Sequence, residues 1–472
     1  MNSVFDISQE IFLLDWIVFS LILILTFTFV LIGNYKKHQS HNDVQSTLDH
    51  LVMGRQLTLP LFIGTLVATW YGGIFGVTQI AFEKGIYNFI TQGLFWYISY
   101  LIFAFFLVGK VSHYEALTLP DLIGKMFGPK SAKLASLFNF FNVLPIAYTI
   151  SIGLFISSLS GWSLNISMAV GLIVVLTYSL KGGLRSVVLS DMIQFYTMCG
   201  GVFAVLAFSL FKYGGFDFLQ EKLPEHYFSI TSDVGYLPML VWGLISLSTL
   251  VDPNFYQRCF AAQSPKVAKK GIIISTLIWF CFDICTTLGA MYARAVIPEA
   301  SSSQGYLIYA LQLLPQGLKG FFLAGILATI LSTLDSYLFL AGATLSYDLN
   351  PRNAKKYPYL HSLGILIVAI ISILMANLFS GNIKMVWKTL GSYSAGCFLF
   401  PVLYGHFTKR TIADKSFVTS CLTGVVTMTI WSFSPRSGIW AEIDSLYIGV
   451  LSTSLFLFGD GLIHTQHKSS RS

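Results

Sequence analysis

Long apolar segments recur along almost the whole of this 472-residue chain, and they limit the folds that it can adopt. Most hold about twenty residues, the length of an α-helix that crosses the hydrocarbon core of a bilayer. Only 11% of the residues are charged, against about 25% in a typical soluble domain. The sequence therefore predicts an all-α integral membrane protein with about thirteen transmembrane helices. Their approximate bounds are 11–33, 59–80, 88–109, 134–160, 163–180, 187–211, 236–257, 270–293, 318–346, 359–379, 386–406, 415–434 and 444–461.

Lysine and arginine residues are unevenly divided between the predicted loops. With the N-terminus outside, 21 of the 29, Arg258 among them, fall in cytoplasmic loops, which is the usual bias of membrane proteins. We therefore expect a multi-pass protein of the inner (cytoplasmic) membrane with its C-terminus in the cytoplasm. No phosphate-binding loop, basic and aromatic repeat or catalytic motif is recognisable, so we expect no ATP-driven pump, no nucleic-acid partner and no enzyme.

The segment at 318–346 combines an apolar composition with a row of hydroxyl groups. At three, four and seven residues after Thr329 follow Ser332, Thr333 and Ser336, which places all four on one helix face. Asp335 lies at the edge of that face, and a carboxylate inside a membrane costs several kcal/mol unless a partner offsets it. A hard cation held by oxygen atoms is one such partner. The alternative is that the hydroxyls bond to carbonyls one turn earlier and serve only helix packing.

Two of the apolar segments are interrupted near their middle. Residues 68–73 place two adjacent glycines inside the second segment, and residues 246–253 place serines, a threonine and an Asp-Pro pair inside the seventh. Broken helices at matching places in two halves of a chain indicate a transporter site. An ordinary glycine or proline kink in each helix is the alternative.

Four passages, in this order and at these spacings, match a known pattern. They are Ala68 to Gly76 followed by Phe82-Glu83-Lys84-Gly85; Gly182-Gly183-Leu184-Arg185-Ser186-Val187 with Ser190-Asp191-Met192-Ile193-Gln194; Gln257-Arg258-Cys259-Phe260-Ala261-Ala262; and Leu331-Ser332-Thr333-Leu334-Asp335-Ser336. With these passages the sequence resembles the sodium:solute symporter family over about residues 30–460.

The resemblance implies a LeuT-like core of two inverted five-helix repeats, with one helix before the core and two after it. The corresponding divisions are an N-terminal helix and cytoplasmic loop (1–58), the first repeat (59–211), an external loop (212–235), the second repeat (236–406) and two C-terminal helices with a short tail (407–472).

The resemblance also implies a sodium site between the second and ninth segments. Its ligands are the carbonyl oxygens of Ala68, Tyr71 and Thr329 and the side-chain oxygens of Ser332 and Thr333. Asp191 matches an aspartate that helps to form a second ion site, or the ion exit, in some members, here with Asp335 and Ser336. Because Asp335 replaces a serine of the members that use two ions, a second sodium ion is a hypothesis. The alternative for Asp191 is a buried partner of Ser, Thr or Arg185.

The solute pocket implied by the resemblance lies between the two broken helices. Its candidate residues are Thr69, Trp70, Gly72, Gly73, Gln79, Asn139, Asn142, Ser246, Ser248, Thr249, Ser392 and Ser394. Trp70 replaces an aspartate of proline-type members, and Ser248 replaces a tyrosine of sugar transporters, so neither substrate class is supported. We expect Asp252 to cap a helix. Asp283 pairs with a neighbouring helix or meets a basic solute group or an ion.

These features predict a secondary active transporter that imports a small polar organic solute with sodium by alternating access. Its expected partners are sodium, the solute and the lipid bilayer, and no cofactor other than the coupling ion is expected. One alternative is a proton-coupled permease of the same fold, in which Asp191, Asp283 or Asp335 relays protons. The other is a membrane receptor that binds a solute without transporting it.

Overall fold

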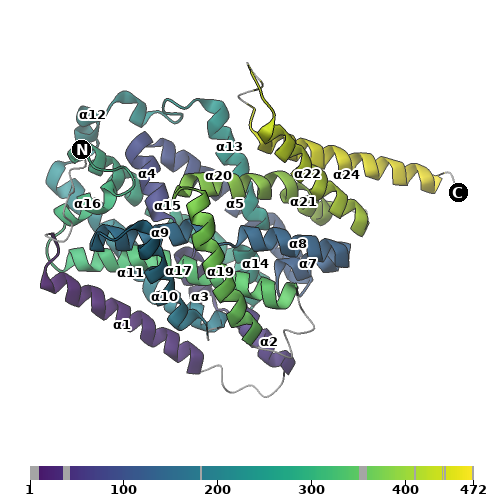
Figure 1. Ribbon diagram of the computed structural model, residues 1–472, viewed down its shortest axis with the longest axis horizontal. Coiled ribbons are helices and arrows are strands. Elements are labelled where there is room, and N and C mark those ends of the chain that lie inside the picture. Colours follow the sequence, from purple (N-terminus) through teal and green to yellow (C-terminus); the bar gives the residue numbers. More distant parts are fainter. Residues whose placement is uncertain are drawn as a thin grey trace.

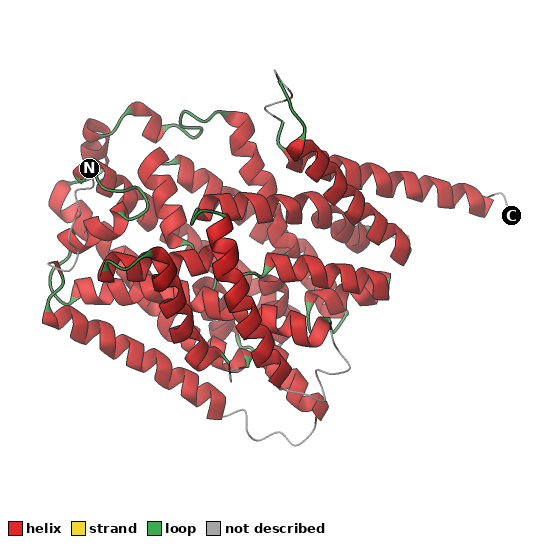
Figure 2. Cartoon of the chain, viewed as in Figure 1, coloured by secondary structure: helices red, strands yellow, loops and turns green. Residues whose placement is uncertain are grey.

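The computed structural model describes residues 10–35, 43–180, 183–349, 359–408, 411–437, 440 and 443–469. Within these ranges the regular elements are helices (Figure 2), and one isolated parallel bridge joins Leu57 to Ala262. The motif residue Gly182 and nine cations of the orientation prediction lie outside the described residues. These nine are Lys36, Lys37, Lys181, Arg352, Lys355, Lys356, Lys409, Arg410 and Arg471.

Helices follow one another with short connections, and several contain 3-10 (η3, η6, η7) or π-helical (η4, η5, η8, η9) turns. Up to residue 213 they are α1 (Leu13–Tyr35), α2 (Asp43–Val52), η3 (Met53–Arg55), α3 (Leu59–Ala68), α4 (Ile74–Lys84), η4 (Phe89–Leu94), α5 (Phe95–Ile102), η5 (Phe103–Leu107), α6 (Val108–His113), α7 (Leu119–Phe127), α8 (Pro129–Asn142), α9 (Ile146–Ser160), α10 (Leu164–Ser179) and α11 (Leu184–Tyr213). The remainder are α12 (Phe216–Lys222), η6 (Glu225–Phe228), α13 (Tyr236–Ser246), η7 (Leu247–Val251), α14 (Pro253–Ala261), α15 (Pro265–Val296), α16 (Gly305–Leu313), α17 (Leu318–Ala343), η8 (Thr344–Asp348), α19 (Tyr359–Leu378), α20 (Ile383–Tyr393), η9 (Ser394–Leu399), α21 (Phe400–Phe407), α22 (Asp414–Phe433) and α24 (Ser445–Ser469).

The lengths and composition of these helices fit a multi-pass membrane protein. Within the described residues, nine helical stretches are long and apolar enough to cross a membrane, and two of them, Pro129–Ser160 and Tyr236–Ala261, contain a break. Leu59–Ala68, Leu164–Ser179 and Ser445–Gly459 are shorter apolar helices. Each of the thirteen predicted segments overlaps a helix or an interrupted helix. The all-helical membrane architecture is therefore as predicted, while the number of crossings remains a prediction.

Helix α17 forms the centre of the molecule (Figure 1). It packs against α1, α3, α9, α10, α11, α14 and α19, and nearly its whole surface is buried. Glycines allow two of these neighbours to come close. A Cβ atom on Gly325 would lie 2.8 Å from the carbonyl oxygen of Thr197 in α11, and one on Gly342 would lie 3.1 Å from that of His361 in α19. The hydroxyl row of α17 therefore faces protein on every side.

Both predicted helix interruptions are present. Helix α3 ends at Ala68 and α4 begins at Ile74, so that residues 69–73 form a non-helical connection. Helix α13 passes through the 3-10 turn η7 and ends before Asp252, whose extended backbone separates it from α14. Irregular backbone inside a membrane protein is tolerated where it is buried or lines a cavity, and both connections meet that condition.

A third interruption divides the segment that the sequence predicts as a continuous helix at 134–160. Helix α8 ends at Asn142 and α9 begins at Ile146, with Pro145 directly before α9. Proline has no N–H to continue a helix from the preceding turn, which accounts for the break. Leu144, in this connection, reaches the central cavity described below.

The two ends of the chain pack differently against the centre. In α1, Asp15 is buried and its Oδ1 accepts hydrogen bonds from the N–H groups of Gly317 (2.6 Å) and Gly320 (3.1 Å), which caps the start of α17. Helices α22 and α24 pack on each other and on η9, and Figure 1 shows them at one side of the molecule. Helix α1 thus contacts the central helix directly, whereas the last two helices cover the periphery.

Candidate functional site

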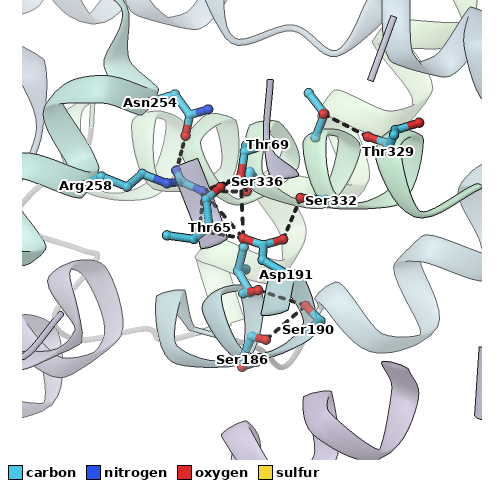
Figure 3. A network of polar contacts seen from close by, with 12 residues as sticks. Thr65, Thr69, Ser186, Ser190, Asp191, Asn254, Arg258, Thr329, Ser332 and Ser336 are labelled. Atoms are coloured by element: carbon cyan, nitrogen blue, oxygen red, sulfur yellow. Dashed lines mark hydrogen bonds and ion pairs between the residues drawn. The ribbon is translucent and has the colours of Figure 1, made fainter. Parts of the chain in front are cut away.

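Asp191 of α11 lies at a point where three helices meet. Its Oδ2 accepts hydrogen bonds from the hydroxyls of Thr65 (2.5 Å) and Thr69 (3.4 Å) at the end of α3. Its Oδ1 accepts one from Ser332 of α17 at 2.6 Å (Figure 3). The side chain is fully buried, and these contacts satisfy its oxygens without direct contact with solvent.

Arg258 of α14 completes this group, and here the sequence-based assignment is wrong. The sequence places Arg258 among the cytoplasmic loop cations, whereas its side chain is 0% exposed. Its Nη2 donates to the hydroxyls of Thr69 (3.0 Å) and Ser336 (2.8 Å) and lies 4.0 Å from Asp191 Oδ2. Its Nη1 donates to Asn254 (Figure 3). Arg258 is thus a resident cation in the protein interior.

The α3–α4 connection lies directly against the hydroxyl row of α17. A Cβ atom on Gly72 would lie 2.5 Å from Cβ and 2.7 Å from Oγ1 of Thr333, so glycine permits this approach. The hydroxyls of Thr69 and Ser336 are 3.4 Å apart. Among the described residues, no backbone N–H bonds to the carbonyl oxygens of Ala68 or Tyr71 in this connection. These two oxygens are available to a cation.

The hydroxyl protons of α17 point to acceptors within the protein. The hydroxyl of Ser332 donates to the carboxylate of Asp191. The hydroxyl of Thr333 donates to the carbonyl oxygen of Thr329 at 3.0 Å, and that of Thr329 donates to the carbonyl oxygen of Ile326 at 2.6 Å. A hydroxyl group that donates its proton still has two acceptor lone pairs. Ser332 and Thr333 can therefore offer oxygen to a cation. The described residues contain no group of three His, Cys, Asp or Glu side chains suited to a transition metal.

Asp335 lies near this group but takes its hydrogen bond from a different helix. It is buried and its Oδ1 accepts a hydrogen bond from Ser179 of α10. Of the three residues proposed for a second ion or its exit, the structure thus brings together Asp191 and Ser336, which share Thr69 and Arg258 as partners. Asp335 pairs with another helix.

A cavity of about 130 Å³ adjoins the α3–α4 connection. Of the predicted solute-pocket residues, Trp70, Gly73, Asn142 and Ser248 line it, and Tyr71 from the predicted sodium site lines it as well. The other lining residues are Val77, Gln92, Trp96, Leu144, Ala147, Tyr148, Ile245, Asp252, Tyr337, Val386, Trp387, Leu390 and Gly391.

The remaining solute-pocket candidates have other positions. Gln79 donates to Glu83 and Ser302, Ser246 contacts Ser99 and the carbonyl of Phe95, and Asn139 donates to Thr344. Asp283 accepts from the hydroxyls of Tyr71 and Tyr97. Thr69 and Gly72 lie on the α17 side of the connection. Thr249, Ser392 and Ser394 are buried, and neither Thr249 Oγ1 nor Ser392 Oγ has a hydrogen-bond partner within the described residues.

Several residues that line the cavity were not predicted from the sequence as part of the solute pocket. Asp252 was expected only as a cap, and its Oδ1 does accept from the N–H groups of Asn254 (2.8 Å) and Phe255 (3.4 Å). It also lines the cavity with Tyr337, whose hydroxyl donates to Asp252 Oδ2 at 3.3 Å. The Asp-Pro pair in a broken helix was the available signal for Asp252. Trp96 and Trp387 gave no such signal, because aromatic residues are common in membrane helices.

Comparisons with known proteins agree with this arrangement. A sodium/pantothenate symporter of Haemophilus influenzae is 26% identical over 320 residues, which are 63% of this chain and 66% of that protein. The high-affinity proline transporter PutP of Bacillus subtilis is 24% identical over 371 residues, 73% of this chain and 76% of that protein. The match thus spans slightly less than two thirds of the length of the pantothenate symporter.

A solved structure shares the fold. The substrate-bound, outward-open state of a Na+-coupled sialic acid symporter superposes with a TM-score of 0.76 at 17% identity, covering 94% of this chain and 97% of that one. The family model of the sodium:solute symporter family matches residues 50–424, which include the α3–α4 connection, Asp191, Arg258 and the hydroxyl row of α17. This chain belongs to the sodium:solute symporter family.

Proposed function

We propose that the protein couples the import of a small polar organic solute to sodium. The observation that carries this proposal is the approach of the α3–α4 connection to the hydroxyl row of α17, where Gly72 meets Thr333. Sodium binds there to the carbonyls of Ala68, Tyr71 and Thr329 and to the hydroxyl oxygens of Ser332 and Thr333. Neutral oxygens suit a hard, singly charged cation and keep its binding reversible.

The proposal includes a topology. Thirteen helices cross the inner membrane, with the N-terminus outside and the C-terminus in the cytoplasm, and residues 59–211 and 236–406 form inverted repeats. Residues 1–58 precede this core, 212–235 form an external loop, and 407–472 follow the core. The matching interruptions at 69–73 and 247–252 support this division, because transporters of this kind bind their solute between two broken helices.

In the proposed cycle, sodium joins α3 to α17 and thereby fixes the wall of the adjoining cavity. Tyr71 belongs to both places, since its carbonyl is a proposed sodium ligand and the residue lines the cavity. Solute binding closes the cavity from one side, and opening on the other side releases sodium past Asp191. Sodium and solute must then raise each other's affinity by the same factor.

Thermal unfolding of the purified protein tests the sodium site. Because sodium binds only the folded protein, the melting temperature should rise with sodium concentration, whereas potassium at equal ionic strength has no such effect. A variant with both Ser332→Ala and Thr333→Ala should lose the response. A folded wild-type protein that ignores sodium would overturn the proposal, and solute uptake driven by a pH gradient without sodium would indicate the proton-coupled alternative.

A further inference from the structure

We propose that the solute carries a positive charge, as a small organic cation with an ammonium group. This inference rests on the proposed transport function and specifies the chemistry of the central cavity. Three features of the cavity support it: its aromatic walls, and, among the described residues that line it, the single acidic residue and the absence of a basic one.

Aromatic side chains surround the cavity. The rings of Trp70 and Trp96 lie 5.6 Å apart at an interplanar angle of 72°. Trp387 packs against Gly73, so closely that a Cβ atom there would overlap its ring. The ring centroids of Tyr148 and Tyr337, which also line the cavity, lie 4.9 Å apart. Faces of tryptophan and tyrosine attract cations, and cages of such rings bind alkylated ammonium groups.

Asp252 gives the cavity its acidic character. It is the one charged residue among the described residues that line the cavity. Its Oδ1 is occupied by the N–H groups that begin α14, whereas the described partner of Oδ2 is the hydroxyl of Tyr337 at 3.3 Å. The N-terminus of α14 stabilises the ionised carboxylate. Oδ2 is therefore an acceptor suited to an ammonium group.

The nearby charges favour a cation as well. Tyr71 lines the cavity while its hydroxyl donates to Asp283, a second buried carboxylate directly behind the wall. The charge of Arg258 also acts on Asp252, but the close contacts of its guanidinium are with Asp191, Ser336 and the threonines of α3. An anionic solute would be buried beside carboxylates with no cation among the described residues that line the cavity, which is strongly unfavourable.

Neutral groups complete the recognition. Gln92 lines the cavity, and its Nε2 is buried without a hydrogen-bond partner within the described residues. A buried donor without a partner is costly, so an oxygen atom of the solute is a suitable acceptor for it. The solute class is therefore an ammonium compound that also carries a hydroxyl or carbonyl oxygen.

Matched probes test the charge requirement. In saturating sodium, the melting temperature is measured with choline and with dimethylbutanol, its neutral isostere. A second pair is aminoethanol and propanol, and dimethylbutanoate serves as the anion. We expect at least one cation of the two pairs to stabilise the protein, while its neutral partner and the anion do not. Equal stabilisation by a neutral partner, stabilisation by the anion, or no response to either cation would overturn the inference.

Variants locate the effect. Asp252→Asn retains an N-cap oxygen but removes the charge, and it should lower the affinity for the stabilising cation by about tenfold or more. Asp348→Asn is the matched control, because that carboxylate bonds to Thr118 (2.6 Å) and does not line the cavity. Unchanged cation affinity in Asp252→Asn would contradict the inference. The effect of sodium alone on the melting temperature, measured in the same assay, separates the charge proposal from the transport proposal. If sodium stabilises the wild type but neither choline nor aminoethanol does, only the assignment of a positive charge to the solute fails.

Discussion

Arg258 is the residue whose environment differs most from what its type suggests. A guanidinium with no exposed surface is stable only when its charge and its donors are matched, and Asp191, Asn254 and the hydroxyls of Thr69 and Ser336 provide that match. The same hydroxyls belong to the helices between which sodium is proposed to bind. Arg258 therefore holds α3, α11 and α17 in register.

Removal of this cation should be costly. Arg258→Met leaves Asp191 buried without its ion pair, and we expect a loss of about 3 to 5 kcal/mol of stability. Arg185→Met is the matched control, because its pair with Asp49 (2.9 Å) is partly exposed and should contribute about 1 kcal/mol or less. Unfolding in detergent measures both. Equal losses would show that Arg258 is not a structural cation.

The capping role of Asp252 can be separated from its charge. Asp252→Ala removes the acceptor for the N–H groups of Asn254 and Phe255, and loss of such a cap costs about 0.5 to 2 kcal/mol. Asp252→Asn should retain most of that stability. Melting temperatures of the two variants without added solute provide the comparison, and an asparagine variant as unstable as the alanine variant would argue against a capping role.

At the scale of elements, the contact between the α3–α4 connection and α17 depends on Gly72. Gly72→Ala places a methyl group against Thr333, which should displace the hydroxyl and weaken sodium binding severalfold or more. Gly109→Ala is the control, since a Cβ atom there meets nothing within 4 Å and alanine favours the helix by about 1 kcal/mol. Sodium titrations of the melting temperature report both effects. Unchanged sodium affinity in a folded Gly72→Ala protein would remove this contact from the site.

Local sequence predicted the elements well because each is determined by nearby residues. The glycines at 72 and 73 and the Asp252-Pro253 pair are sufficient to interrupt their helices, and the interruptions lie where they were expected. The break before α9 was missed although Pro145 signals it. The apolar run at 134–160 predicts one continuous helix, because hydropathy depends on side chains and does not reflect the N–H group that proline lacks.

At the scale of the whole molecule, the cavity could be predicted only in part. Its lining combines residues of η4, α4, α5, α8, α9, α13, α17 and α20 with the connections after α3, α8 and α13, so it depends on how distant helices meet. Trp70 and Ser248 lie in predicted interruptions, whereas Trp387 lies within a helix and Arg258 near a helix end. Their burial follows from tertiary packing, which no local pattern encodes.

The proposed orientation can be tested on whole cells. Glu221 in α12 is expected outside and Lys266 at the start of α15 inside, and both are exposed. Single cysteines are introduced there after the six native cysteines have been replaced. Glu221→Cys should react with a membrane-impermeant maleimide in intact cells, and Lys266→Cys only after permeabilisation. The reverse pattern would invert the topology.

Equilibrium binding of radioactive sodium to the purified protein tests the central claim most directly. We expect saturable binding to wild type that excess unlabelled sodium displaces and excess potassium does not. The double variant Ser332→Ala with Thr333→Ala loses two of the five proposed ligand oxygens and should lose this binding while it remains folded. Sodium binding that persists unchanged in the folded double variant would place the ion elsewhere and contradict the coupling of α3 to α17 by sodium.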